Sequence, residues 1–162
     1  MEDMYLKIGD IKGEAEGDLA GQITVLSFNF GATQSATMHV SKGGGSAAAT
    51  VRDLIVKKRV DSASPVLFAQ CANGTHIPTA TLTVRKAGGS QIEYFKVEME
   101  EVIISGYDVG IAMGDKEQIE ETVTLNCARI KTIYAPQDGS SGGAGGTAEG
   151  GWSMQEKKPW PA

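Results

Sequence analysis

Cysteine and histidine, the residues of disulfides and many metal sites, are scarce in this sequence, which contains two of each. Cys71 and Cys127 are far apart and match neither a metal-binding nor a redox spacing. Both lie in apolar stretches, which favours buried free thiols, although a single disulfide between them is possible. His39 and His76 form no i, i+4 pair, and no further ligands accompany Cys71 and His76. The sequence therefore predicts no metal site and no cofactor.

A surplus of basic residues and long hydrophobic runs are also missing. The formal net charge is −5, whereas a nucleic-acid binder usually carries a basic face. No run approaches the roughly 18 apolar residues that a membrane span requires. Residues 1–10 lack the basic and apolar regions of a secretory signal. We expect no nucleic-acid partner, no membrane insertion, synthesis in the cytoplasm, and an export route without a cleaved signal if the protein leaves the cell.

The length of 162 residues and the hydrophobic fraction of 41% suit one folded domain over residues 1–162. Residues 138–151 are mostly glycine, serine, alanine and threonine, as in a solvated loop or linker. In the C-terminal tail, residues 152–162, Trp152 and Met154 predict an anchor for a final short strand.

Period-two alternation with β-branched residues and glycine turns dominates the chain. It predicts strands at residues 5–8, 23–30, 34–40, 51–60, 79–86, 91–104 and 120–134. The apolar parity changes near Glu100–Glu101 and again near Ala128, and a β-bulge would explain the first change.

One short helix interrupts the strands. Ser64 suits the N-cap and Pro65 the first helical position, and Asn73–Gly74 suits a left-handed end. A helix this short is marginal alone, so it must dock on a sheet. The chain is therefore predicted to be mainly β, an antiparallel β-barrel of two sheets with one short α-helix.

A catalytic set of nucleophile, base and oxyanion site is not evident. Residues 139–143 match G-x-S-x-G but lack the strand before and the helix after that a nucleophile elbow requires. Residues 43–48 resemble a dinucleotide loop, yet a strand pattern follows instead of a helix. Glu98, Glu100 and Glu101 could form an acid/base pair but fit a solvated strand face better. We predict that the protein is not an enzyme.

Several segments resemble, in order, those of one family. They are YLKIGDIKGEAEG from Tyr5, ITVLSFNFGATQS from Ile23, KKRVDSASPVL from Lys57, LTVRKAGG from Leu82, ETVTLNCARIKTIYAPQ from Glu121 and the pair Gly151–Trp152. This series resembles the haemolysin-coregulated protein (Hcp) family, the tube protein of type VI secretion, over roughly residues 4–155, with LTVRKAGG the most specific piece. The family more often has tryptophan where Phe28 and Phe30 stand.

The resemblance implies a β-barrel of two sheets flanked by one helix, and homo-hexameric rings that stack head-to-tail into a tube. A contractile sheath would surround the tube, a spike would sit at its tip, and effector proteins would travel in its lumen. The resemblance implies a structural protein, secreted from the bacterial cytoplasm through the type VI machine without a signal peptide.

Within such an assembly the chain offers several candidate contact residues. In strand 23–30, Ser27 and Asn29 alternate with Leu26, Phe28 and Phe30, so we expect the two polar residues to face the lumen and its cargo. The glycine loop and the hairpin turn are natural rim elements, and a basic cluster suits contacts between net-negative subunits. The candidates for inter-subunit or ring-stacking contacts are Gly43, Gly44, Gly45, Lys57, Lys58, Arg59, Gly88 and Gly89.

Two other functions compete with this interpretation. An effector enzyme fused to the same fold would need a further C-terminal domain, and the residues after Trp152 are too few for one. A monomeric β-sandwich binding module, such as a carbohydrate binder, would need an exposed aromatic platform. The four tyrosines, four phenylalanines and two tryptophans lie mostly inside strand patterns, which leaves little for such a platform.

Overall fold

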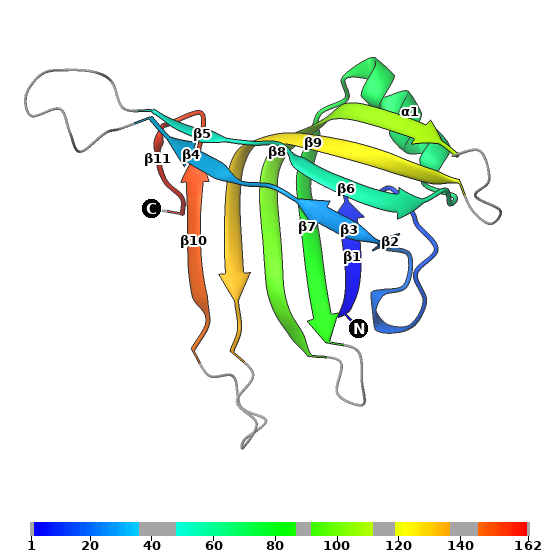
Figure 1. Ribbon diagram of the computed structural model, residues 1–162, viewed down its shortest axis with the longest axis horizontal. Coiled ribbons are helices and arrows are strands. Elements are labelled where there is room, and N and C mark those ends of the chain that lie inside the picture. The colour runs from blue at the N-terminus through cyan, green and yellow to red at the C-terminus, as the bar shows by residue number, and fades with distance from the viewer. Residues whose placement is uncertain (1, 36–47, 87–91, 112–118, 137–145, 162) are drawn as a thin grey trace, which may run out of the picture.

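The computed structural model describes residues 2–35, 48–86, 92–111, 119–136 and 146–161. Strands dominate it, with one α-helix and one turn of 3-10 helix (Figure 1). The elements are β1 (Glu2–Ile8), η1 (Gly17–Leu19), β2 (Ile23–Val25), β3 (Ser27–Asn29), β4 (Ala32–Gln34), β5 (Ala49–Val51), β6 (Leu54–Arg59), α1 (Ser64–Asn73), β7 (Ile77–Lys86), β8 (Glu93–Gly110), β9 (Glu120–Tyr134), β10 (Ala148–Ser153) and β11 (Lys158–Pro159).

All strand pairs are antiparallel, and they form two layers that share the long strands β8 and β9. The large layer contains β1, β7, the first half of β8, the second half of β9, and β10. The small layer contains β3, β6 and the remaining halves of β8 and β9. Strands β4 and β5 pair separately as a two-stranded ribbon. The mainly β, antiparallel prediction with one α-helix is confirmed. The hydrogen-bonded path does not close into a barrel in the described part of the chain, because it runs from β11 to β2.

The hydrophobic core lies between the layers. Its buried side chains come from every long strand, and they include Leu6, Leu54, Leu82, Met99 and Leu125. On β7, Leu82 and Val84 are two residues apart and both are buried. Trp152 pairs with Ile130 across β10 and β9, and Met154 packs against the core, so the predicted C-terminal anchor is also confirmed.

The two parity changes occur side by side in β8 and β9. Met99 and Val102 are both buried, and so are their partners Ile130 and Cys127. In both strands the buried side chains switch from one face of the strand to the other at the same level, where Glu101 has a positive φ of 53°. The pairing register continues unchanged through this row, and the shift in the β8–β9 register occurs later, between Ile104 and Gly106. The predicted bulge near Glu100–Glu101 was therefore wrong. A backbone twist there turns the strands from one layer into the other.

The predicted strand 23–30 divides at Leu26. Strand β2 pairs with β1, and β3 pairs with β6, so the chain passes from one layer to the other at this residue. Phe28 packs against the core and Ser27 and Asn29 are exposed, as the alternation predicted. Leu26, predicted to share the face of Phe28, is instead 38% exposed, because the bend separates its orientation from that of β3.

Helix α1 ends as predicted, with Gly74 in the left-handed conformation at φ 63°. Its start differs from the prediction by one residue, because Ala63 is the N-cap and Ser64 lies inside the helix. Leu67 is its one buried large apolar side chain, whereas Val66 and Phe68 are exposed. Among the described residues, no helix is long and apolar enough to cross a membrane.

Candidate functional site

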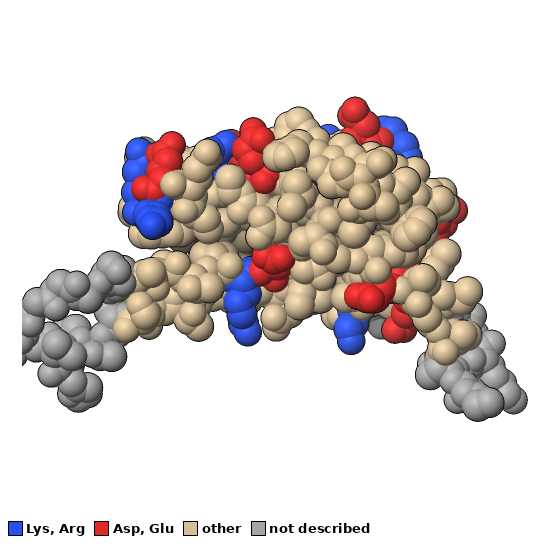
Figure 2. Space-filling view, turned by 90° about the horizontal axis from the view of Figure 1, so that it is seen from above, with Lys and Arg blue, Asp and Glu red and all other residues tan. Residues whose placement is uncertain are grey.

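A polar wall covers the outer face of the small layer. Ser27 pairs with Lys57 across β3 and β6, and Lys57 pairs in turn with Thr122 of β9. In the next row Asn29 pairs with Ile55, which is 38% exposed. Figure 2, which looks down on the whole molecule from above Figure 1, shows a mainly uncharged middle with Lys, Arg, Asp and Glu side chains toward the edges of the view. The wall therefore offers hydrogen-bonding side chains and a cation, Lys57, beside the partly exposed apolar side chain of Ile55.

The predicted basic cluster is divided by the strand geometry. Lys57 and Arg59 are exposed on the polar wall, whereas Lys58 is completely buried. Successive side chains on a strand point to opposite faces, so three consecutive cations cannot share one surface. Only Lys57 and Arg59 remain accessible to a partner, and Lys58 is removed from the candidate contact residues.

The buried Lys58 occupies the centre of a polar cluster between β6, β9 and the start of α1. Its ammonium group pairs with the Glu121 carboxylate and with Asp61 Oδ1 at 2.9 Å, and it donates to the Arg59 carbonyl at 2.9 Å. The Ser64 hydroxyl donates to Glu121 Oε1 at 2.7 Å, and the Tyr107 hydroxyl donates to the other oxygen of Glu121. Both side chains of the Lys58–Glu121 pair are 0% exposed. We call these five residues, Lys58, Asp61, Ser64, Tyr107 and Glu121, the buried cluster.

Two groups in the structure have strongly shifted acidities. Burial, reinforced by the hydrogen bond to Glu121 and its negative charge, raises the pKa of Tyr107 to about 12. Burial, with a smaller contribution from the Asp53 carboxylate, raises the pKa of Cys127 to about 12. Cys71 and Cys127 are both free thiols, Cys127 buried and Cys71 partly so, which agrees with the predicted absence of a disulfide.

One end of the molecule exposes apolar side chains around the start of α1, the end of β8 and the start of β9. We call this set the apolar end; it consists of Leu26, Val60, Val66, Phe68, Val109, Ile111 and Ile119, all between 38% and 60% exposed. Leu26, Val60 and Ile119 line a hollow of about 510 Å³ together with Glu14 and Arg59. Arg59 makes no ion pair in the described part of the chain.

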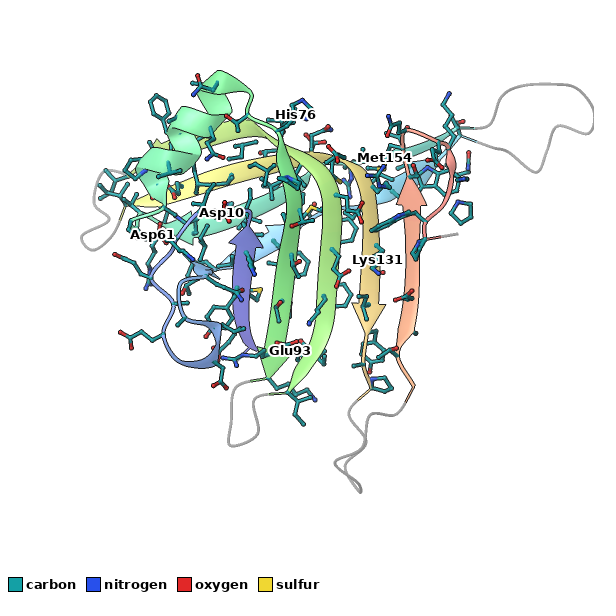
Figure 3. All side chains as sticks on the ribbon, turned by 180° about the vertical axis from the view of Figure 1, so that it is seen from behind. Asp10, Asp61, His76, Glu93, Lys131 and Met154 are labelled. Atoms are coloured by element: carbon teal, nitrogen blue, oxygen red, sulfur yellow. The ribbon has the colours of Figure 1, made fainter. Side chains whose placement is uncertain are left out.

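The opposite end carries the β4–β5 ribbon, whose β4 residues are all exposed. Figure 3 shows the separation, with Asp61 at the α1 side of the molecule and Met154 at the side from which the ribbon projects. Arg52 lies over Gly31 at the base of the ribbon, where its guanidinium would clash with a β-carbon at position 31. A side chain at this glycine would displace the arginine.

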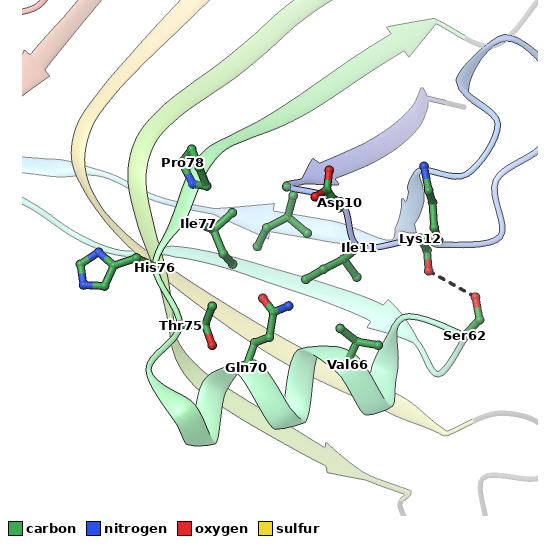
Figure 4. Close-up of a pocket in the computed structure, with 12 residues that line it drawn as sticks. Asp10, Ile11, Lys12, Ser62, Val66, Gln70, Thr75, His76, Ile77 and Pro78 are labelled. Carbon is green, nitrogen blue, oxygen red and sulfur yellow. Dashed lines mark hydrogen bonds between the residues drawn. The ribbon is translucent and has the colours of Figure 1, made fainter.

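A groove of about 500 Å³ runs along α1 and is shown in Figure 4. Its lining is mixed, with apolar Ile11, Val66 and Ile77 beside polar residues that include Asp10 and His76. At one end the Ser62 hydroxyl donates to the Lys12 carbonyl at 3.3 Å. Gln70 Oε1 lies buried in it without a hydrogen-bond partner among the described residues.

The glycine candidates lie outside the described residues: Gly43, Gly44 and Gly45 between β4 and β5, and Gly88 and Gly89 between β7 and β8. Within the described ranges, no group of three or more His, Cys, Asp or Glu residues could hold a metal ion.

The family of the chain follows from comparison with known proteins. The family model described as "Type VI secretion system effector, Hcp" matches residues 5–134. The chain belongs to the Hcp family. Protein hcp1 of Pseudomonas aeruginosa is 39% identical over 156 residues, which cover 95% of this chain and 96% of that protein. The crystal structure of Hcp1 from Salmonella typhimurium has a TM-score of 0.79 at 34% identity and covers 98% of each chain. A structure of a type six secretion system protein reaches a TM-score of 0.88 at 29% identity, covering 98% of this chain and 99% of the other.

Hcp proteins are secreted structural tube proteins and not enzymes, so the family membership confirms the prediction of a non-enzymatic protein. It also confirms the resemblance seen in the sequence segments. Neither the buried cluster nor the apolar end was predicted from the sequence. The burial of Lys58 could have been predicted from the strand alternation. Leu54 and Val56 face the core, and residue 58 points to the same side of the strand.

Proposed function

We propose that this Hcp-family chain is the structural subunit of a type VI secretion tube, built from stacked homo-hexameric rings that carry effector proteins in their lumen. The observation that carries the proposal is the presence of two dissimilar surfaces at opposite ends of one subunit, the apolar end and the β4–β5 ribbon. A ring needs heterologous contacts, in which one surface of a subunit meets a different surface of the next.

The apolar end has the character of a subunit contact. Seven large apolar side chains at least 38% exposed are concentrated there, and exposed apolar clusters mark interaction sites. The hollow beside Arg59 would receive side chains of the neighbouring subunit. Arg59 and Glu14 on its wall form no ion pair with another described residue, and their charges would select the partner's orientation.

The polar wall is the proposed lumen surface, with Ser27 and Asn29 in contact with cargo. Exposed polar side chains can exchange hydrogen bonds with water, which suits a carrier that must release its cargo. The glycine segments Gly43–Gly45 and Gly88–Gly89 are the proposed ring-stacking elements. Sheath and spike proteins of the type VI machine would be the other partners, and the tube would leave the cytoplasm through that machine without a signal peptide.

Native mass spectrometry or light scattering of the purified chain tests the ring. We expect a species of six times 17.0 kDa. Val109→Asp should dissociate the ring because it places a charge in the apolar end, whereas Tyr134→Asp, a similarly exposed residue outside that end, should leave the ring intact. A monomer of the native chain across a wide concentration range would remove the ring and favour the monomeric binding module.

The lumen and stacking assignments need separate tests. Asn29→Arg should reduce the amount of effector protein that copurifies with rings, while Asn73→Arg on the exposed end of α1 serves as the matched control. Equal loading of both variants would contradict the lumen assignment. Deleting residues 43–47 should abolish stacked tubes in electron micrographs, and tubes that persist would exclude this loop from stacking.

A further inference from the structure

The buried cluster has an unusual position for so polar a group. Lys58 and Glu121 are fully buried, Ser64 is 3% exposed, and the Asp61 side chain is 11% exposed. Four of the five residues come from elements that reach the apolar end, namely β6, the α1 start, the second half of β8 and the first half of β9, and Asp61 lies in the connection between β6 and α1. The cluster therefore lies beneath the surface proposed to contact the next subunit.

A buried ion pair contributes little to stability by itself. Removing two charges from water costs more than their attraction usually returns, and well-packed apolar residues in the same place often give equal or higher stability. Polar groups retained in this situation can instead select one geometry, since hydrogen bonds are directional and apolar contacts are not. Here the geometry is over-determined, because Lys58 has oxygen partners on Arg59, Asp61 and Glu121.

Helix α1 needs such a directional constraint. Leu67 is its only buried large apolar side chain, and Cys71 is partly buried, so apolar packing leaves the helix able to rotate or slide on β8. Ser64 in the first turn of α1 fixes it by donating to Glu121 and accepting from the Asp61 backbone N–H at 2.9 Å. Asp61 Oδ1 also accepts from the Ala63 N–H at 3.0 Å, immediately before the helix.

The same cluster positions an exposed aromatic residue. The Tyr107 hydroxyl is held by Glu121, and the Tyr107 ring contacts the Phe68 ring at a centroid distance of 5.8 Å. Phe68 is 60% exposed on α1 and is the most exposed member of the apolar end. The position of Phe68 thus depends on the buried cluster through two contacts, the helix start and the tyrosine ring.

We propose that Lys58 and Glu121 are positioning residues for subunit assembly: they hold α1 and Phe68 in the arrangement that the neighbouring subunit recognises, and they add little to the stability of the fold. The proposed effect on assembly rests on the proposed ring, whereas the proposed effect on the position of α1 does not. Lys58 and Glu121 would act through α1 and Phe68, whereas the exposed residues of the apolar end would touch the neighbouring subunit themselves.

The test replaces the whole cluster core with apolar side chains of similar volume. Lys58→Met, Glu121→Leu and Tyr107→Phe are combined, because a single substitution would leave a buried charge unpaired. Asp61 loses its cation in this variant, but its carboxylate is 11% exposed to water and keeps the Ala63 N–H and the Ser64 hydroxyl as donors. The triple variant is made in the native chain and in the Val109→Asp background, where both forms should be monomeric and stability is compared without the contribution of assembly.

In the monomeric background we expect the melting temperature of the triple variant within about 5 °C of its parent, with native-like far-ultraviolet circular dichroism. Hydrogen exchange at the α1 amides should be at least about tenfold faster than in the parent, while β7 amides are unchanged. In the native background the apparent dissociation constant of the ring should rise at least about tenfold.

Three results would overturn the inference: a collapse of the melting temperature, unchanged protection of α1, or unchanged ring assembly. If the native chain never forms a ring, the proposed function fails, and the exchange of α1 in the monomer still decides whether the cluster positions the helix.

Discussion

Ion pairs occur in two contrasting environments in this molecule. On the outer face of the large layer, Lys96 pairs with Glu93 at 2.7 Å and Lys131 pairs with Glu98 at 3.3 Å, and these side chains are between 17% and 37% exposed. Under the apolar end, Lys58 and Glu121 are both 0% exposed. The exposed pairs can exchange protein partners for water at little cost, whereas the buried pair has no such alternative. The same two residue types therefore cover a surface in one place and determine a geometry in the other.

The largest difference in stability between the two environments is expected when one partner of an ion pair is removed. Lys58→Met leaves the Glu121 carboxylate buried and unpaired, and should lower the free energy of unfolding by about 3–5 kcal/mol. Urea denaturation monitored by circular dichroism measures this loss. A loss below about 1 kcal/mol would mean that water reaches Glu121 and that the pair is not buried in solution.

Thiol reactivity provides a second comparison of buried and accessible groups. Cys127 should react with iodoacetamide at pH 8 at least about tenfold more slowly than Cys71, because burial raises the Cys127 pKa to about 12 and shields the sulfur. Peptide mass spectrometry after timed alkylation gives both rates from one sample. Similar rates would show that the core around Cys127 opens readily.

Tyr107 should make stability depend on alkaline pH. Its pKa of about 12 in the folded protein lies above the ordinary value of 10.0, so the folded state retains the proton more strongly than the unfolded chain does. The resulting stabilisation is complete below about pH 10 and is lost as pH rises toward about 12. The difference in unfolding free energy between the native chain and Tyr107→Phe should shrink over this range, and a constant difference would contradict the assigned pKa.

The smallest effect is expected for an exposed pair. Lys96→Met makes the same substitution as Lys58→Met but removes the Lys96–Glu93 pair, whose side chains are each 36% exposed. The free energy of unfolding should change by no more than about 0.5 kcal/mol. A loss comparable to that of Lys58→Met would remove the distinction between the two environments.

Local patterns in the sequence predicted most of the strands and the single helix. The left-handed end at Gly74 follows from backbone preference, and the exposure of Ser27 and Asn29 follows from short-range periodicity. The predictions failed where the chain changes layer. At Leu26 the partner strand changes from β1 to β6, and such a change leaves no mark in the alternation of a single strand.

The candidate site was also predicted only in part, because alternation along one strand shows which residues share a face but not which distant segments meet. Ser27 and Asn29 lie on one exposed face, but the basic cluster was treated as a unit although strand geometry turns Lys58 inward. The apolar end was not predicted, because Phe68, Val109 and Ile119 lie in separate segments and each alone looks like a core residue. Their shared exposure becomes evident only when the elements that carry them are placed together.

The sequence by itself determined the mainly β character of this chain, the extent of its helix and its family, since these depend on local periodicity, turn residues and the order of short segments. Tertiary structure alone decided that β8 and β9 turn together at Glu101, that Lys58 meets a carboxylate 63 residues away, and that apolar side chains from α1, β8 and β9 share one end. These features depend on which distant segments lie side by side, and that outcome is set by packing of the whole core and not by any single stretch of residues.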